Sequence, residues 1–183
     1  ELGIRFTTYA SSIGPVRAAS FEPEEITRNP FCLPDASAAE KASAYLEECM
    51  AAHDSTGGVI ECRIEGVPAG IGDPVFGKLD ALFAQALMSI GAVKAVEIGD
   101  GTAVSETKGS GNNDAFTMAG GTVTKLTNHA GGILGGAADA RGGAVSVELM
   151  FIALCIASVA VALLFARSSG RHPELALDAP NKL

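Results

Sequence analysis

Basic residues are scarce in this 183-residue sequence. Lysine and arginine together number 13 against 21 aspartates and glutamates, which gives a formal net charge of −8. Proteins that bind nucleic acids neutralise backbone phosphates with basic side chains, so this balance argues against that class. It also argues against a strongly anionic substrate that this chain would hold alone.

Cysteine is scarce as well, and its spacing lacks the common zinc motifs. The four cysteines are Cys32, Cys49, Cys62 and Cys155, and no two of them form a C-x-x-C pair. Structural zinc sites usually depend on such pairs, so we expect no metal site. Three of the four lie in segments with an apolar pattern, and we expect buried, reduced thiols as in cytosolic proteins.

The sequence also has no initial methionine and no secretory signal peptide. It begins with ELGIRFTTYA, in which Ile4, Phe6 and Thr8 occupy alternate positions. This alternation is typical of a strand. We therefore expect a strand almost at the first residue, and a chain that is a piece of something longer.

Regular elements are predicted further along the chain. Ser37 and Glu40 have the spacing of a capping box, which predicts a helix from residue 37 to about residue 51. GVIECRIEGVP alternates apolar and charged residues and is predicted to be a strand with one solvated face. AVKAVEI, residues 92–98, is predicted to be another strand.

The stretch GVPAGIGDPVFGKLDALFAQALMSI, residues 66–90, combines a glycine-rich loop with an apolar periodic segment. Asp73 suits an N-cap and Pro74 the first helical position, so a helix is predicted from Asp73 to Ile90 with Gly91 ending it. Its predicted buried face contains Leu79, Leu82, Phe83 and Leu87, whereas Lys78 and Gln85 lie off that face. The loop lacks the third glycine of G-x-G-x-x-G, which argues against a dinucleotide cradle.

Two later segments are rich in glycine. ETKGSGNNDAF has the composition of a polar loop. The glycines of TNHAGGILGG would let backbone approach a flat ligand closely, although a plain glycine turn fits the same residues. His129 has no acid or metal partner nearby in the sequence, which favours a structural role.

Four sequence blocks together resemble the chorismate synthase family. They are SIGPV, NPFCLPD, GGVIECRIEGVPAGIGDPVFGKLDALFAQALMSIGAVKAVEIGDG and TNHAGGILGG, and they occur in the family's order between about Gly3 and Gly136. The resemblance implies an α+β fold, a sandwich of antiparallel sheets and helices that is incomplete here. It also implies that GVPAGIGDP is a structural turn rather than a phosphate cradle.

The family converts 5-enolpyruvylshikimate 3-phosphate to chorismate by eliminating phosphate. This carbon–oxygen lyase reaction of aromatic amino-acid biosynthesis requires reduced FMN. The resemblance therefore implies a cytoplasmic homotetramer with reduced FMN as cofactor. Some members also reduce their own flavin, which would add NADP as a partner.

The family motif assigns three flavin-binding positions in this sequence, namely Gly91, Ala92 and Gly135. It assigns no catalytic residue here, because the G-E-S-H-G and G-R-S-S-A-R-E-T motifs are absent. The K-P-T flavin loop is absent too. A second hypothesis is therefore a catalytically inactive fragment or a membrane-tethered remnant of the enzyme.

The tail departs from the family. We expect residues 1–136 to form the family-like part and residues 137–183 a divergent tail with an apolar C-terminal helix at about residues 147–166. The apolar run Leu149–Ala166 is near the length of a membrane span. One interpretation is a transmembrane helix with Arg167 and Arg171 on the cytoplasmic side. The others are an apolar helix buried in the core or between subunits, and the product of a frameshift or gene rearrangement.

Overall fold

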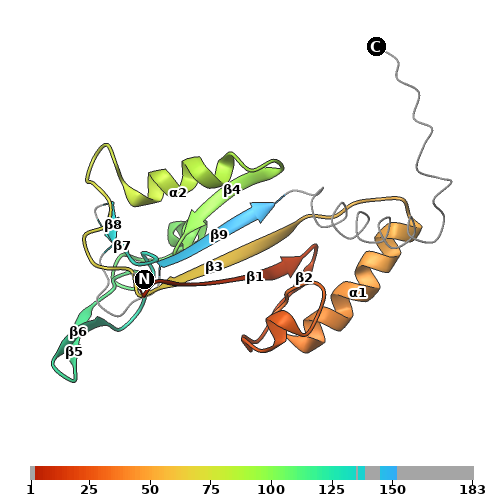
Figure 1. The fold of residues 1–183 in the computed structure, drawn as a ribbon, viewed down its shortest axis with the longest axis horizontal. Coiled ribbons are helices and arrows are strands. Elements are labelled where there is room, and N and C mark those ends of the chain that lie inside the picture. Colours follow the sequence, from red (N-terminus) through yellow and green to blue (C-terminus); the bar gives the residue numbers. More distant parts are fainter. Residues whose placement is uncertain (1–2, 135, 139–144, 152–183) are drawn as a thin grey trace, which may run out of the picture.

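The centre of the protein is a five-stranded sheet with the strand order β2-β1-β3-β9-β4 (Figure 1). The structure is a computed structural model, and it describes residues 3–134, 136–138 and 145–151. Every neighbouring pair in the sheet is antiparallel. This arrangement confirms the predicted mixture of helices and antiparallel strands.

The elements follow one another along the chain as short strands separated by helices and loops. The strands of the sheet are Arg5–Ile13 (β1), Val16–Arg17 (β2), Gly58–Glu65 (β3), Val93–Ile98 (β4) and Val145–Phe151 (β9). Two hairpins pair Phe116–Ala119 (β5) with Thr122–Lys125 (β6), and Ile133–Leu134 (β7) with Ala137–Ala138 (β8). The helices are Ala36–Ala51 (α1), Leu79–Met88 (α2) and the 3-10 helices Glu25–Thr27 (η1) and Gly101–Glu106 (η2).

The three strands predicted from alternating residues are all present, as β1, β3 and β4. Helix α1 is present too, but its predicted cap is wrong. Asp35, not Ser37, is the N-cap, and its Oδ1 accepts the Ala38 N–H at 3.1 Å. The Asp35 backbone is extended (φ −141°, ψ 114°), as an N-cap requires, and its position lets the same carboxylate serve a second segment.

That second segment is the loop before η1. Asp35 Oδ2 accepts the Ala19 N–H at 2.9 Å and the Ser20 N–H at 3.2 Å. The N–H groups of Ala19 and Ala38 hold the pKa of Asp35 below its ordinary value, against the opposing effect of burial. One carboxylate therefore fixes both the start of α1 and the path of the loop beside it.

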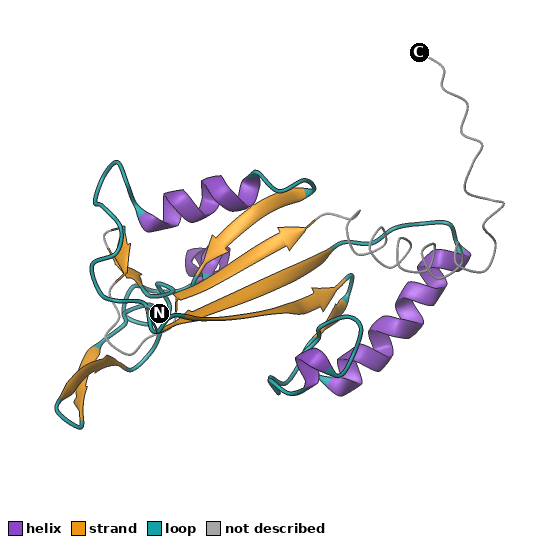
Figure 2. Ribbon diagram, viewed as in Figure 1, coloured by secondary structure: helices purple, strands orange, loops and turns teal. Residues whose placement is uncertain are grey.

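Two apolar clusters stabilise the sheet at different places. One joins β1 to α1 through Ala10, Ile13, Leu33 and Ala42. The other joins the sheet to α2 around the buried side chains of Ile64 and Leu79. Figure 2 accordingly shows α2 beside β4, and α1 near the β1–β2 end of the sheet.

The predicted apolar helix at residues 147–166 is wrong at its start, because residues 145–151 form β9. This strand lies between β3 and β4, with Cys62 and Ile98 both opposite Val147. The sequence VSVELMF alternates apolar residues with period two, which suits a strand. Residues 152–166 lie outside the described residues, and within the described part of the chain no helix is long and apolar enough to cross a membrane.

The predicted burial of the cysteines is wrong for those that the structure describes. Cys32, Cys49 and Cys62 are free thiols, but Cys32 is exposed and Cys49 and Cys62 are only partly buried. The Cys32 backbone lies in the left-handed region (φ 56°), in the turn that follows Asn29. Cys155 lies outside the described residues. In the part that the structure describes, no group of three acidic, histidine or cysteine side chains could hold a metal ion.

Candidate functional site

Several loops meet where β4 ends, at the glycine-rich end of the sheet. Asp114, from the polar loop before β5, lies at the centre of this junction. Its Oδ1 accepts the His129 N–H at 2.7 Å and the Thr127 hydroxyl at 2.9 Å, and its Oδ2 accepts the Ala130 N–H at 2.9 Å. The segment predicted as a plain polar loop therefore carries the carboxylate that holds the TNHAGG turn in place.

Lys125 completes this arrangement from the end of β6. Its Nζ lies 3.6 Å from Asp114 Oδ2, and both side chains are almost fully buried, with 7% and 4% exposed. Burial works to raise the pKa of Asp114, but the N–H groups of Ala130 and His129, the Thr127 hydroxyl and the Lys125 ammonium outweigh it and lower that pKa. The carboxylate is consequently charged over the whole physiological range.

Asp100 and His129 form a second polar pair at the same junction. Asp100 Oδ2 lies 2.6 Å from His129 Nδ1, and the Asp100 N–H donates to the His129 carbonyl at 2.8 Å. The backbones can approach this closely because Gly99 and Gly131 lack side chains: a Cβ on Gly99 would collide with the His129 carbonyl and the Gly131 nitrogen. The expectation that His129 has no acidic partner is therefore wrong.

A concave pocket of about 340 Å³ opens beside this turn. Its lining combines apolar side chains, two amides and one carboxylate, namely Asn112, Asn113, Asp114, Ala115, Phe116, Ala130 and Leu134. Asn112 Oδ1 is buried and accepts no hydrogen bond from the described residues. The described lining of this pocket contains no lysine or arginine that would neutralise a phosphate.

The GVPAGIGDP loop is attached to the same end of the sheet by backbone hydrogen bonds. The Gly70 N–H donates to the Ala138 carbonyl, and the Ala138 N–H donates to the Ile71 carbonyl, each at 2.8 Å. The Leu79 N–H donates to the Gly136 carbonyl at 2.7 Å. A structural turn in this segment is thus confirmed, and helix α2 begins only after the residues that bind β8.

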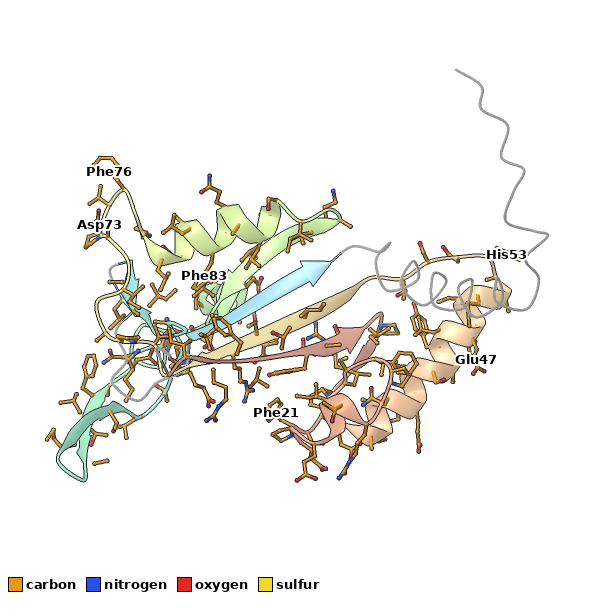
Figure 3. All side chains as sticks on the ribbon, in the orientation of Figure 1. Phe21, Glu47, His53, Asp73, Phe76 and Phe83 are labelled. Carbon is orange, nitrogen blue, oxygen red and sulfur yellow. The ribbon has the colours of Figure 1, made fainter. Side chains whose placement is uncertain are left out.

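The predicted helix start at Asp73 is wrong. Asp73 and Gly77 close a tight turn through two backbone hydrogen bonds of 2.8 and 3.1 Å, and Val75 has φ 75°, which a helix does not allow. Phe76 is 96% exposed at the tip of this turn and points away from the sheet (Figure 3). Helix α2 begins at Leu79 instead, with Lys78 as its N-cap.

Only part of the predicted apolar face of α2 is buried. Leu79 is buried, and Phe83 and Leu87 pack partly buried against the same cluster; Figure 3 shows Phe83 on the side of α2 that faces the sheet. Leu82 is 49% exposed, so its predicted burial is wrong. At about 100° per residue, Leu82 lies roughly 100° from the centre of the stripe formed by Leu79, Phe83 and Leu87.

Of the three predicted flavin contacts, the structure describes Gly91 and Ala92. Gly91 and Ala92 form the corner between α2 and β4, with Gly91 exposed and Ala92 half-buried. The left-handed residue there is Ala92 (φ 70°), not Gly91, so the prediction that Gly91 ends the helix is wrong. Gly135 lies outside the described residues, but its neighbour Gly136 contacts the opposite end of α2 through Leu79.

Sequence reasoning missed the two polar clusters because they join residues distant in the chain. Asp100 and His129 are 29 positions apart, and Asp114 reaches residues 13 to 16 positions away. The available signals were the aspartate in GDG and the one in NND, both of which also suit ordinary turns. No spacing rule connects those turns to the TNHAGG segment.

Comparisons with known proteins agree on one family. The family model described as chorismate synthase matches residues 1–162. The curated chorismate synthase of Agathobacter rectalis is 55% identical over 141 residues, covering 76% of this chain and 38% of its own length. That of Cereibacter sphaeroides strain ATCC 17029 is 48% identical over 136 residues, covering 73% of this chain and 37% of its own.

A solved structure gives the same result for the fold. A crystal structure of a chorismate synthase matches with a TM-score of 0.76 and 26% identity, over 83% of this chain and 50% of the solved chain. The chain thus spans less than two fifths of the length of the curated relatives described above. The ordered motif blocks, the matched fold and the relatives at up to 55% identity lead to one conclusion: this chain belongs to the chorismate synthase family.

Proposed function

We propose that this chain is a portion of a chorismate synthase, which contributes backbone to the flavin site and is completed by segments it does not contain. The reaction is the elimination of phosphate from 5-enolpyruvylshikimate 3-phosphate to give chorismate. The observation that carries this proposal is the 55% identity to a chorismate synthase over 141 residues. Identity at that level over one continuous stretch supports the same reaction class.

Gly91, Ala92 and Gly135 are the proposed flavin contacts. A Cβ on Gly91 would have no heavy atom within 4 Å, so space lies open beside this backbone. Ala92 holds a left-handed conformation that non-glycine residues rarely adopt, and such outliers cluster at functional sites. Both features support a ligand approaching the α2–β4 corner.

The length of α2 sets the separation between the Gly136 contact and the Gly91 corner. Gly136 contacts Leu79 at the start of the helix, and the ten residues of α2 separate that point from the Gly91 corner. At 1.5 Å per residue the helix alone spans roughly 15 Å. The homotetramer is proposed from the family resemblance alone.

Reduced FMN, when bound, would supply the electron-rich group that assists loss of phosphate without net oxidation. The backbone at the proposed contacts Gly91, Ala92 and Gly135 would orient the flavin ring and exclude water from it. The described pocket residues include no basic side chain, so the cationic groups that hold the substrate phosphate would come from the family's arginine-rich segment. The proposed location of the complete enzyme is the cytoplasm.

Flavin titration tests this proposal. We expect the chain alone to quench FMN fluorescence weakly, and the chain joined to an upstream family segment to quench it in a saturable way. Gly91→Val should fold normally, because its Cβ has open space, but should weaken flavin binding by about tenfold or more. Gln85→Ala, an exposed change on α2, is the matched control. If Gly91→Val and Gln85→Ala bind FMN with equal affinity, Gly91 is not part of the flavin site.

A further inference from the structure

The Asp100–His129 pair has a geometry that fixes one imidazole orientation. The ring is held by the 2.6 Å contact between Nδ1 and Asp100 Oδ2, while the His129 backbone is held by Asp114 and by the Asp100 N–H. Both ends of the residue are thus anchored by separate hydrogen bonds. The side chain remains 27% exposed, so water and a ligand can reach it.

The carboxylate also selects the imidazole tautomer. An ionised carboxylate accepts hydrogen bonds and donates none, so Nδ1 must carry the hydrogen. In the neutral ring Nε2 is then an acceptor with a directed lone pair. Among the described residues no hydrogen bond to Nε2 occurs, which leaves this nitrogen for an external donor.

The charged groups around the Asp100–His129 pair indicate which class of ligand could donate a hydrogen bond to Nε2. Glu97, near the end of β4, accepts the Thr102 hydroxyl at 2.8 Å, and Asp114 accepts the His129 N–H at 2.7 Å. The nearby ammonium, that of Lys125, is already paired with Asp114. This acidic surrounding disfavours a phosphate and favours a neutral or cationic group with an N–H or O–H.

We propose that His129 is a proton acceptor of this site and that Asp100 is its positioning residue. The inference rests on the proposed function, because the ligand would be the flavin or substrate, with an N–H or O–H group rather than its phosphate directed at His129. The N–H or O–H bond of the ligand breaks, its electron pair stays on the ligand atom, and the proton bonds to Nε2. Asp100 stabilises the resulting imidazolium, which later releases the proton to water.

The tautomer can be measured on the chain itself by long-range ¹⁵N–¹H correlation of the histidine rings at neutral pH. We expect His129 to carry its hydrogen on Nδ1. Asp100→Asn should move the hydrogen to Nε2, because the carboxamide can donate to Nδ1. Glu106→Gln, which removes an exposed charge near the end of η2, should leave the tautomer unchanged. A hydrogen on Nε2 in the parent, or no change in Asp100→Asn, would overturn the proposal.

Turnover provides the second measurement, in the chain completed with the missing family segments. His129→Gln and Asp100→Asn should each lower kcat by about 100-fold, with a much smaller change in KM, while Glu106→Gln keeps the parent rate. Full activity of His129→Gln in an active completed enzyme would exclude the proton-accepting role. Absence of chorismate from the completed parent would instead count against the proposed function. The tautomer measurement would still decide whether Asp100 positions the His129 ring.

Discussion

Replacing Asp114 by asparagine should open the glycine-rich end of the sheet. The asparagine can keep one carbonyl oxygen for the His129 N–H and the Thr127 hydroxyl. Its amide nitrogen would then face the Ala130 N–H, which donates to Oδ2 at 2.9 Å, and the Lys125 ammonium at 3.6 Å. Two attractive contacts would become donor–donor contacts in a buried place.

The size of the effect follows from these contacts. Leaving a buried N–H without an acceptor costs about 1–3 kcal/mol, and breaking a buried ion pair by removing one charge costs about 3–5 kcal/mol. Because relaxation of the loops and the remaining Lys125 interaction recover part of this, we expect a loss of about 2–4 kcal/mol for Asp114→Asn. That is a large share of the 5–15 kcal/mol typical of a domain.

Hydrogen exchange is the assay that reports this junction directly, because a local opening need not appear in a global melt. The amides of His129 and Ala130 should exchange roughly 30–1,000 times faster in Asp114→Asn, which corresponds to the same 2–4 kcal/mol. Asp54→Asn, an exposed change after α1, is the control. Parent-like protection of both amides in Asp114→Asn would refute the reasoning.

Three further predictions concern stability and can be checked by denaturant melts. Leu79→Ala should lower the free energy of unfolding by about 2–5 kcal/mol and Leu82→Ala by less than about 1 kcal/mol, and equal losses would contradict the assigned helix face. Gly99→Ala should lower it by about 2–4 kcal/mol, since a Cβ there meets backbone at φ 61°; a neutral result would argue against the close contact. Because the pKa values of Asp35 and Asp114 are lowered in the folded state, their contribution is complete well above pH 3.9 and disappears as pH falls through the folded values. A melt midpoint unchanged between pH 6 and pH 3 would contradict this sign.

Local patterns in the sequence were sufficient to predict β1, β3 and β4, because each strand alternates its residues between the two faces of the sheet. They failed at Asp73, where a good N-cap followed by proline forms a turn because β8 binds the preceding loop. They also failed at Ser37, because the carboxylate of Asp35 is needed by a loop 15 residues away. In both cases a tertiary contact outweighed a local preference.

The candidate site was predicted even less completely. The family motif assigns Gly91, Ala92 and Gly135 to the flavin site, and this assignment stays a prediction. Asp100 and Asp114 lie in segments whose composition indicates turns, and nothing in that composition connects them to His129. The expected burial of Leu82 failed because the buried face was taken too wide: Leu82 lies roughly 100° from the centre of the stripe formed by Leu79, Phe83 and Leu87.

Chorismate formation is the measurement that tests the central claim most directly. Purified chain would be mixed with 5-enolpyruvylshikimate 3-phosphate and reduced FMN under anaerobic conditions, alone and joined to the missing family segments, and chorismate would be quantified. We expect no chorismate above the buffer blank from the chain alone, and clear turnover from the completed protein. Chorismate from the chain alone would contradict the proposal that other segments supply essential groups, and no turnover from a folded, flavin-binding completed protein would contradict the assigned activity.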